Sequence, residues 1–241
     1  MPDMAGTASL PIDVGRETLD RMSKVERYNL ALLEDRGFRR EPRARGGSGT
    51  GNMSAFVLDR PLLFLTDLNP SYRADLERAH GQLANVRVLA WDLEKPAPAE
   101  VAAAGLDTII CLNVLEHVKQ DGLALANMAS ALGSGGRLLL MVPAVKALYG
   151  TLDIHLEHHR RYAKGELLAK LRETGFQIEK VSHMNFFGMF GWFVNSRIFQ
   201  RQILSTRQLF LFNKLAPLFI AIERRLFIPV GLSLVVIARR P

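Results

Sequence analysis

Three polar side chains each follow directly on an apolar run, in an order that suits the binding of a small polar ligand. They are Asp67, Asp92 and Asn113, and the runs before them cover 62–66, 86–91 and 108–112. Apolar runs without alternation are typical of strands that are covered on both faces of a parallel sheet. The carboxyl ends of such strands meet at one edge, where ligands bind. Helix capping explains one such residue well and three poorly, so the sequence favours a nucleoside-type ligand.

The third of these positions is followed by Glu116 and His117, which open a helical pattern that continues to Leu132. An amide and a Glu-His pair at the end of a strand are candidates for site residues. The plain alternative is that Asn113 forms a turn, that Glu116 is a first-turn acid favoured by the helix dipole, and that His117 is a surface histidine.

A glycine-rich loop lies before the first of these strands. Gly47, Gly49 and Gly51 are spaced G-x-G-x-G, and glycine allows the backbone to approach a ligand closely. Such a loop is weak evidence alone, because Gly/Ser turns are common. Asp67, the acid that follows the next strand, strengthens the case for a ligand-binding loop. An acid at this position is usually the one that holds a ribose diol.

A second polar cluster covers 149–162, with the sequence YGTLDIHLEHHRRY. Imidazole titrates near neutral pH and can take a proton from an acceptor hydroxyl. The candidate bases are Asp153, His155, His158 and His159. Arg160 and Arg161 are suited to bidentate contact with a substrate carboxylate or phosphate. The plain alternative is a solvated loop at the start of a helix. We expect no metal, because the histidines lack a CxxC or HExxH pattern.

Strands and helices alternate along the chain, which predicts an α/β fold with a parallel sheet covered on both faces. Helices are expected at 19–33, 72–83 and 123–132, and further strands at 137–142, 176–181 and 231–237. With 241 residues and 48% hydrophobic content, we expect one domain over 1–241, with a helical cap at 1–35.

The composition limits the partners and the compartment. A formal net charge of +7 allows attraction to anionic groups, but the charge is scattered and few aromatic residues lie between basic ones, so we expect no nucleic acid partner. Cys111 is the single cysteine, which excludes a disulfide framework and favours the cytoplasm. No signal peptide and no transmembrane helix are expected. The sequence does not fix the oligomeric state.

An apolar insertion rich in Phe, Leu and Ile covers 186–229. Its interpretation stays open between a helical cap packed on the sheet, a lid over an apolar acceptor, and a surface that rests on a membrane or partner. Asn185 is a polar group next to such a site.

At this point the chain resembles the class I S-adenosylmethionine-dependent methyltransferases, of the type 11 or type 12 kind. The matching segments are GGSGTGN at 46–52, LTDLNPSY at 65–72, WDLEK at 91–95, LDTIICLNVLEHVKQD at 106–121 and GSGGRLLLMVPA at 133–144. A subset of this family also carries a segment like that at 153–162. The resemblance implies a Rossmann-like sheet of seven strands in the order 3-2-1-4-5-7-6, with the last strand antiparallel.

The resemblance also implies S-adenosylmethionine as cofactor, S-adenosylhomocysteine as product, and a small-molecule or lipid-like acceptor. The implied cofactor-binding residues are Gly47, Gly49, Gly51, Asp67, Leu68, Asp92, Leu93 and Asn113, with Asp67 on the ribose and Asp92 on the adenine amino group. We predict His117, Asp153, His158 and Tyr162 as catalytic residues, and His159, Arg160, Arg161 and Asn185 as substrate-binding residues.

One segment departs from the family pattern. In that family the first strand is an apolar run that ends in an acid. At the corresponding positions this chain has Glu41, Pro42 and Arg45. Proline cannot donate to a central ladder, and an unpaired buried arginine is costly. Either the segment leaves the sheet, or its arginines face a polar site, or the cofactor site is impaired. The alternatives to methyl transfer are therefore an inactive binding or membrane-associated module, and a non-methylating enzyme with the same cofactor site.

Overall fold

The computed structural model describes residues 45–46, 54, 57–226 and 228–241. The predicted N-terminal helix at 19–33 and the glycines at 47, 49 and 51 lie outside these residues.

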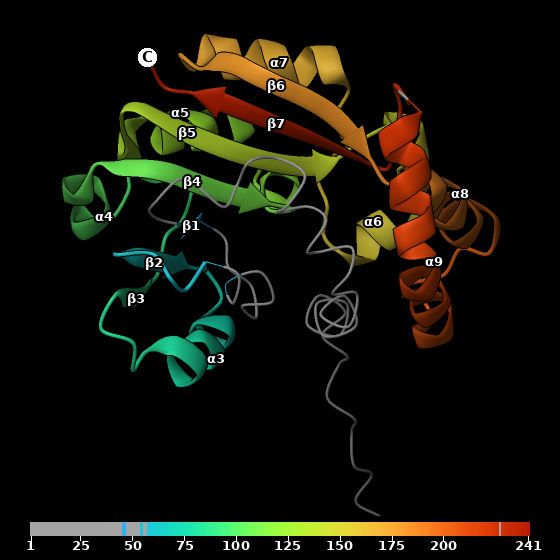
Figure 1. Ribbon diagram of the computed structural model, residues 1–241, viewed down its shortest axis with the longest axis horizontal. Helices are drawn as coiled ribbons and strands as arrows, with labels where there is room; N and C mark the ends of the chain where they lie inside the picture. The colour runs from blue at the N-terminus through green and yellow to red at the C-terminus, as the bar shows by residue number, and fades with distance from the viewer. Residues whose placement is uncertain (1–44, 47–53, 55–56, 227) are drawn as a thin grey trace, which may run out of the picture.

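The first three strands form a parallel sheet in the order β1-β2-β3 (Figure 1). They are β1 (Arg45–Gly46), β2 (Leu63–Thr66) and β3 (Val86–Leu89). Arg45 pairs with Leu65, and Thr66 pairs with both Gly46 and Leu89. Arg45 and Gly46 therefore lie in the sheet, whereas Glu41 and Pro42 of the segment that departs from the family pattern lie outside the described residues. β3 ends earlier than the predicted strand at 86–91.

The remaining strands form a four-stranded mixed sheet in the order β4-β5-β7-β6. They are β4 (Leu106–Leu112), β5 (Leu132–Pro143), β6 (Gln177–Met184) and β7 (Ser233–Arg239). β4 and β5 run parallel, and β7 lies antiparallel to both β5 and β6. The antiparallel last strand is as predicted.

These observations confirm a Rossmann-like fold with a mixed α/β architecture, and they differ from the prediction in the number of sheets. The described strands form two sheets, not one continuous sheet of seven. β1 nevertheless lies between β2 and β4 and contacts β4 (Figure 1).

Helices follow most strands, with boundaries set by local sequence. α3 (Pro70–His80) begins after Asn69, whose side chain accepts a hydrogen bond from the amide of Ser71. The others before β6 are α4 (Ala99–Ala104), α5 (Asp121–Ala131), α6 (Thr151–His155) and α7 (Lys164–Glu173), with the short 3-10 turns η3 (Leu115–His117) and η4 (Lys146–Leu148). The helical pattern expected from Val114 is broken between η3 and α5.

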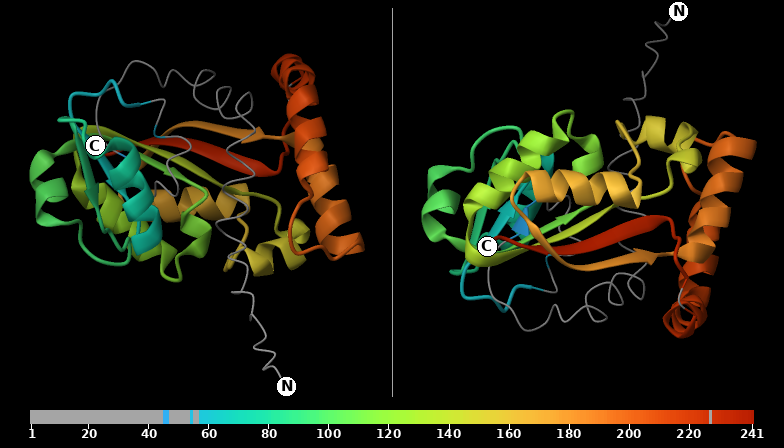
Figure 2. Two further views of the ribbon diagram at one scale, coloured as in Figure 1. Left: turned by 90° about the horizontal axis from the view of Figure 1, so that it is seen from below. Right: turned by 90° about the horizontal axis from the view of Figure 1, so that it is seen from above.

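Two apolar clusters hold the layers together. α5 and α7 cover one face of the four-stranded sheet (Figure 2), where Leu125, Met128 and Leu171 pack with β4 and β5. The other cluster joins Leu76 of α3 to the opposite side chains of β2, β4 and β5. Cys111 is buried, as predicted, and burial raises the pKa of its thiol to about 12.

The insertion consists of α8 (Phe186–Phe193), the π-helical turn η5 (Val194–Ile198) and α9 (Thr206–Arg225). α9 stands at the end of the four-stranded sheet (Figures 1 and 2). Ser205 and Gln208 form a capping box at its start. Among the described residues, no helix combines the length and the apolar character that a membrane crossing needs.

Candidate functional site

The strand ends of the three-stranded sheet place the first predicted polar residue at a defined edge. Asp67 directly follows β2, and its amide donates to the carbonyl of Leu89 at the end of β3 (3.2 Å). Its carboxylate accepts a hydrogen bond from the amide of Asn69 (2.9 Å). Gly46 pairs with Thr66, so β1 ends at this same edge. Leu68, the next residue, is 63% exposed.

Asp92 repeats this local arrangement after β3. Its carboxylate accepts from the amide of Glu94 (3.0 Å) and lies 3.3 Å from the ammonium group of Lys95. Leu93 is buried and belongs to the apolar core. Both acids thus fix the turn that follows their own strand, by the side-chain-to-backbone bond that is common for Asp in turns.

Asn113 lies directly after β4 and is exposed. Its backbone has φ 52°, a left-handed conformation that asparagine tolerates better than most residues. Its amide donates to the carbonyl of Met141 (2.9 Å), which fixes the strand end.

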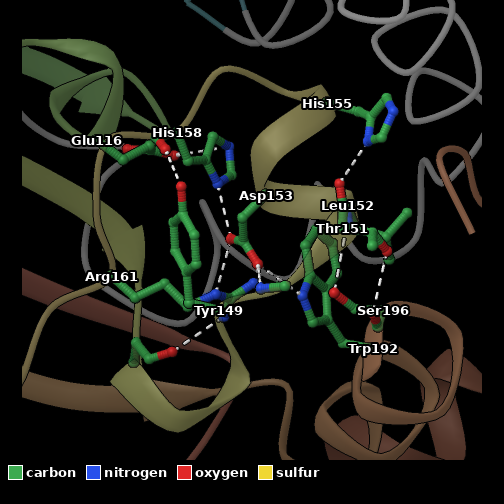
Figure 3. A network of polar contacts seen from close by, with 12 residues as sticks. Glu116, Tyr149, Thr151, Leu152, Asp153, His155, His158, Arg161, Trp192 and Ser196 are labelled. Carbon is green, nitrogen blue, oxygen red and sulfur yellow. Dashed lines mark hydrogen bonds and ion pairs between the residues drawn. The ribbon is translucent and has the colours of Figure 1, made fainter. Parts of the chain in front are cut away.

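The second polar cluster is organised around the carboxylate of Asp153, which is fully buried (Figure 3). One oxygen lies 2.9 Å from Nδ1 of His158 and accepts from Nε of Arg161 (2.8 Å). The other accepts from the amide of Gly150 (3.0 Å) and from Nε1 of Trp192 (3.2 Å). Burial alone would raise the pKa of Asp153, but the bond from His158 and the charge of Arg161 outweigh it and hold the pKa below its ordinary value.

Arg161 is 2% exposed and occupied by partners inside the protein. Besides Asp153 it donates to the carbonyl of Ala144 (3.0 Å), and its guanidinium lies 4.7 Å from the ring centre of Trp192. Such a buried, fully engaged arginine holds the chain together. These contacts give Arg161 a positioning role, and its contact with substrate stays a prediction.

Glu116 is fully buried beside this network. Neither of its carboxylate oxygens has a hydrogen-bond partner among the described residues. Oε1 lies 3.9 Å from Nε2 of His158, and the rings of His158 and His117 meet edge to face at 4.8 Å. Burial raises the pKa of Glu116 to about 8. The structure thus brings the predicted residues His117, Asp153 and His158 together and adds Glu116 to them.

Tyr162 lies apart from this group and is also fully buried. Its hydroxyl donates to Asp121 (3.0 Å), which also accepts from Lys170 (2.7 Å). Burial raises the pKa of Tyr162, and the carboxylate of Asp121 raises it further. The hydroxyl thus belongs to an ion-pair network inside the protein, and the catalytic role of Tyr162 stays a prediction.

The other predicted substrate-binding residues have different environments. Arg160 is partly exposed and contacts Asp121 (2.9 Å) and the carbonyl of Lys119 (2.8 Å). His159 is exposed, and its amide donates to the carbonyl of Glu116 (2.8 Å). Asn185 caps α8, where its side chain accepts from the amide of Gly188 (2.9 Å). Asn185 is thus a helix cap, and its contact with substrate stays a prediction.

The insertion contacts the polar cluster directly. Besides Trp192, the side chain of Thr151 donates to the carbonyl of Ser196 (3.0 Å) (Figure 3). Arg197 donates to the carbonyl of Tyr149 (3.0 Å). No sequence pattern predicts these contacts, because Trp192 stands in an apolar run whose period fits a packed helix equally well.

Comparison with known proteins agrees with this architecture. Residues 46–138, from the end of β1 into β5, match a family model described as a methyltransferase domain. No curated protein matches the sequence. An S-adenosylmethionine-dependent methyltransferase from Mesorhizobium loti is similar in structure, with a TM-score of 0.56 and 16% identity over 83% of this chain and 90% of that one.

Two further solved structures share the fold. One is a putative methyltransferase from Bacillus halodurans, with a TM-score of 0.56 and 19% identity over 91% of this chain and 99% of that one. The other is the cyclase SpnF, with a TM-score of 0.58 and 18% identity over 90% of this chain and 81% of that one. Residues 46–138 therefore match a methyltransferase domain, and the chain shares its fold with the S-adenosylmethionine-dependent methyltransferase from Mesorhizobium loti.

Proposed function

We propose that this protein transfers the methyl group of S-adenosylmethionine to a small-molecule or lipid-like acceptor. The observation that carries the proposal is the register of the first sheet. Gly46, Thr66 and Leu89 lie side by side at the ends of β1, β2 and β3. Gly47 and Asp67 directly follow Gly46 and Thr66 in the sequence, so both follow strands that end at the same edge of the sheet. This is the edge at which α/β folds bind nucleosides.

The proposed cofactor contacts follow this edge. Asp67 accepts hydrogen bonds from the ribose hydroxyls, Asp92 from the adenine amino group, and Asn113 lies near the sulfonium end. Carboxylates suit a diol and an exocyclic amine, because both present N–H or O–H donors. The full proposed set is Gly47, Gly49, Gly51, Asp67, Leu68, Asp92, Leu93 and Asn113.

The exposed face of α9 supports a lipid-like acceptor or contact with a membrane surface. Leu211, Leu215 and Leu218 are spaced i, i+4, i+7 and are between 37% and 57% exposed, so they form an apolar stripe. Arg207 and Lys214 are exposed on the same helix. An apolar stripe with basic neighbours is suited to the surface of an anionic membrane.

We also propose that the two sheets form one layer in the order 3-2-1-4-5-7-6, with β1 joined to β4. The contact between β1 and β4 supports this. In this proposal residues 1–241 form one domain, in which 186–229 is a helical insertion that covers the polar cluster at 149–162.

Two other functions share this fold. A chain with Arg45 in β1 could have an impaired cofactor site and act as a binding module. The second alternative function is that of an enzyme that does not transfer a methyl group. The likeness to SpnF, which is a cyclase, favours this alternative.

The test is calorimetric titration with S-adenosylhomocysteine. We expect Asp67→Asn to weaken binding by about 1–3 kcal/mol, because the amide replaces one carboxylate oxygen with a donor. Asp59→Asn is the matched control, since Asp59 is 79% exposed and lies before β2. No binding by the unaltered protein would favour the inactive module. Binding of S-adenosylmethionine without any release of S-adenosylhomocysteine would favour the non-methylating enzyme.

A further inference from the structure

Three side chains beyond the proposed cofactor contacts converge on one point. Glu116 and His117 come from η3, and His158 follows α6. A carboxylate oxygen and one nitrogen of each imidazole all lie within 4.8 Å of one another. From the sequence we expect no metal and weigh only His155, His158 and His159 as ligands, because the sequence does not show that η3 meets the segment after α6.

The carboxylate of Glu116 is the first sign that something binds here. It is fully buried, and neither oxygen has a hydrogen-bond partner among the described residues. Burying an ionised carboxylate without partners is costly, so such an acid either takes up a proton or binds a cation. The charge of Arg161 acts on Glu116, but its Nε and Nη1 donate to Asp153 and to the carbonyl of Ala144, and no hydrogen bond among the described residues joins it to Glu116.

His158 is oriented as a ligand. Its Nδ1 lies 2.9 Å from Asp153, and an ionised carboxylate only accepts, so Nδ1 carries the proton. The lone pair of the neutral ring is then on Nε2, which faces Glu116 at 3.9 Å. This separation is too long for a hydrogen bond and exceeds by about 0.5 Å the distance between two ligands of one tetrahedral ion. A carboxylate behind the second nitrogen is the usual support of a metal-binding histidine.

His117 completes the group from the outer side. Its ring meets that of His158 edge to face, and the residue is exposed. An ion held by these three side chains would therefore have its remaining positions on the solvent side, where water or a substrate can reach them.

We propose that Glu116, His117 and His158 bind one divalent transition-metal ion, of the class of Zn²⁺, Mn²⁺ or Co²⁺, with Asp153 as the outer support of His158. Two imidazoles and one carboxylate suit these ions, whereas Mg²⁺ and Ca²⁺ prefer oxygen ligands throughout. Three protein ligands leave at least one position open, as in catalytic metal sites.

The site also narrows the class of acceptor, and this step rests on the proposed function. Glu116 and His117 follow Asn113 at the end of β4, beside the proposed sulfonium. A hydroxyl of the acceptor bound at the open position loses its proton to water more readily. Its oxygen then forms the bond to the methyl carbon as the carbon–sulfur bond breaks, and the sulfonium becomes the thioether of S-adenosylhomocysteine.

The test uses the full chain after treatment with a chelator. Titration with Co²⁺ is followed by visible ligand-field absorption, and titration with Zn²⁺ by calorimetry. We expect one ion per chain. His117→Gln and Glu116→Gln should each weaken binding more than about tenfold, since even changes behind the ligands weaken metal binding 10–100-fold. His155→Gln is the matched control, because that imidazole bonds to the carbonyl of Thr151, outside the cluster.

The proposal is overturned if the unaltered protein binds neither ion, or if His117→Gln binds as the unaltered protein does. Equal weakening by His155→Gln would also overturn it, because the ion would then bind to surface histidines generally. Titration of the same samples with S-adenosylhomocysteine separates the two proposals. Retained cofactor binding without metal binding rejects only the metal site, and metal binding without cofactor binding rejects only the proposed function.

Discussion

Nδ1 of His158 lies 2.9 Å from the buried carboxylate of Asp153, and this contact decides which way the imidazole presents its second nitrogen. The same carboxylate accepts from Arg161 and from Trp192 of the insertion. One acid therefore orients the histidine and ties α6 to α8. The residue that the sequence identifies as a candidate base is, in the structure, the centre of a positioning network.

Asp153→Asn should lower the free energy of unfolding by about 3–5 kcal/mol, because it leaves the buried guanidinium of Arg161 without its counter-charge. Urea denaturation measures the change. Asp59→Asn, which alters an exposed ion pair, should cost about 0–1 kcal/mol. Adding Arg161→Met to Asp153→Asn should recover part of the loss. A double variant as unstable as the sum of its single variants would contradict a direct coupling.

Asp121→Asn should lower stability in a way that depends on pH. Burial would raise the pKa of Asp121, but the bonds from Lys170 and Tyr162 and the charge of Arg160 outweigh it and lower the pKa. Because the pKa of Asp121 is lower in the folded protein, its ionised form stabilises the fold. This contribution is present in full above the ordinary Asp pKa of about 3.9 and decreases as the pH falls below it.

Unfolding by urea between pH 8 and pH 3 tests this sign. The difference between the unaltered protein and Asp121→Asn should be constant down to about pH 5 and should shrink below about pH 4. A difference that grows as the pH falls would show that the carboxylate is not held in its charged form.

β2 and β4 could be predicted because their side chains are largely apolar on both faces, which leaves few alternatives. The runs at 62–66 and 108–112 agree with β2 and β4 to within about two residues. The helix expected from Val114 was wrong in detail, since Val118 adopts an extended conformation and ends η3 before α5 begins. Residues 133–136 precede the predicted strand at 137–142, yet they lie within β5. The pairing with β4 is irregular there, since Leu106 pairs with Leu132 and Thr108 with Arg137.

The candidate site could be predicted only in part, because its geometry depends on contacts between distant segments. The segment at 149–162 was identified by its density of polar residues, yet its spacing does not reveal that Arg161 points inward to Asp153 or that Tyr162 reaches Asp121. The sequence identifies Glu116 as a candidate site residue, with the alternative that it is an acid in the first turn of a helix. Its burial follows from the packing of η3 against the loop before α7, which no local pattern encodes.

The junction between the insertion and β7 gives a packing prediction. Gly231→Ala should lower the free energy of unfolding by about 1–3 kcal/mol, because a Cβ there would overlap the backbone of Met184. Gly165→Ala is the matched control in α7. Its Cβ would meet no atom within 4 Å, so alanine should raise stability by about 0.5–1 kcal/mol. Thermal unfolding of both variants distinguishes them, and a neutral Gly231→Ala would contradict the close approach of the two backbones.

The apolar stripe on α9 gives a prediction about membranes. Leu211 and Leu218 are 56% and 57% exposed, and their replacement by serine removes apolar area without emptying the core. If the stripe rests on lipid, Leu211→Ser with Leu218→Ser should weaken sedimentation with vesicles of phosphatidylglycerol and phosphatidylcholine at least tenfold, because each leucine contributes about 1.5–3 kcal/mol when buried. Leu123→Ser, at a 42% exposed position on α5, should bind as the unaltered protein does. Binding should also weaken with salt, because Arg207 and Lys214 interact with the anionic headgroups. Vesicle binding that is unchanged in the double variant would show that the stripe does not contact lipid.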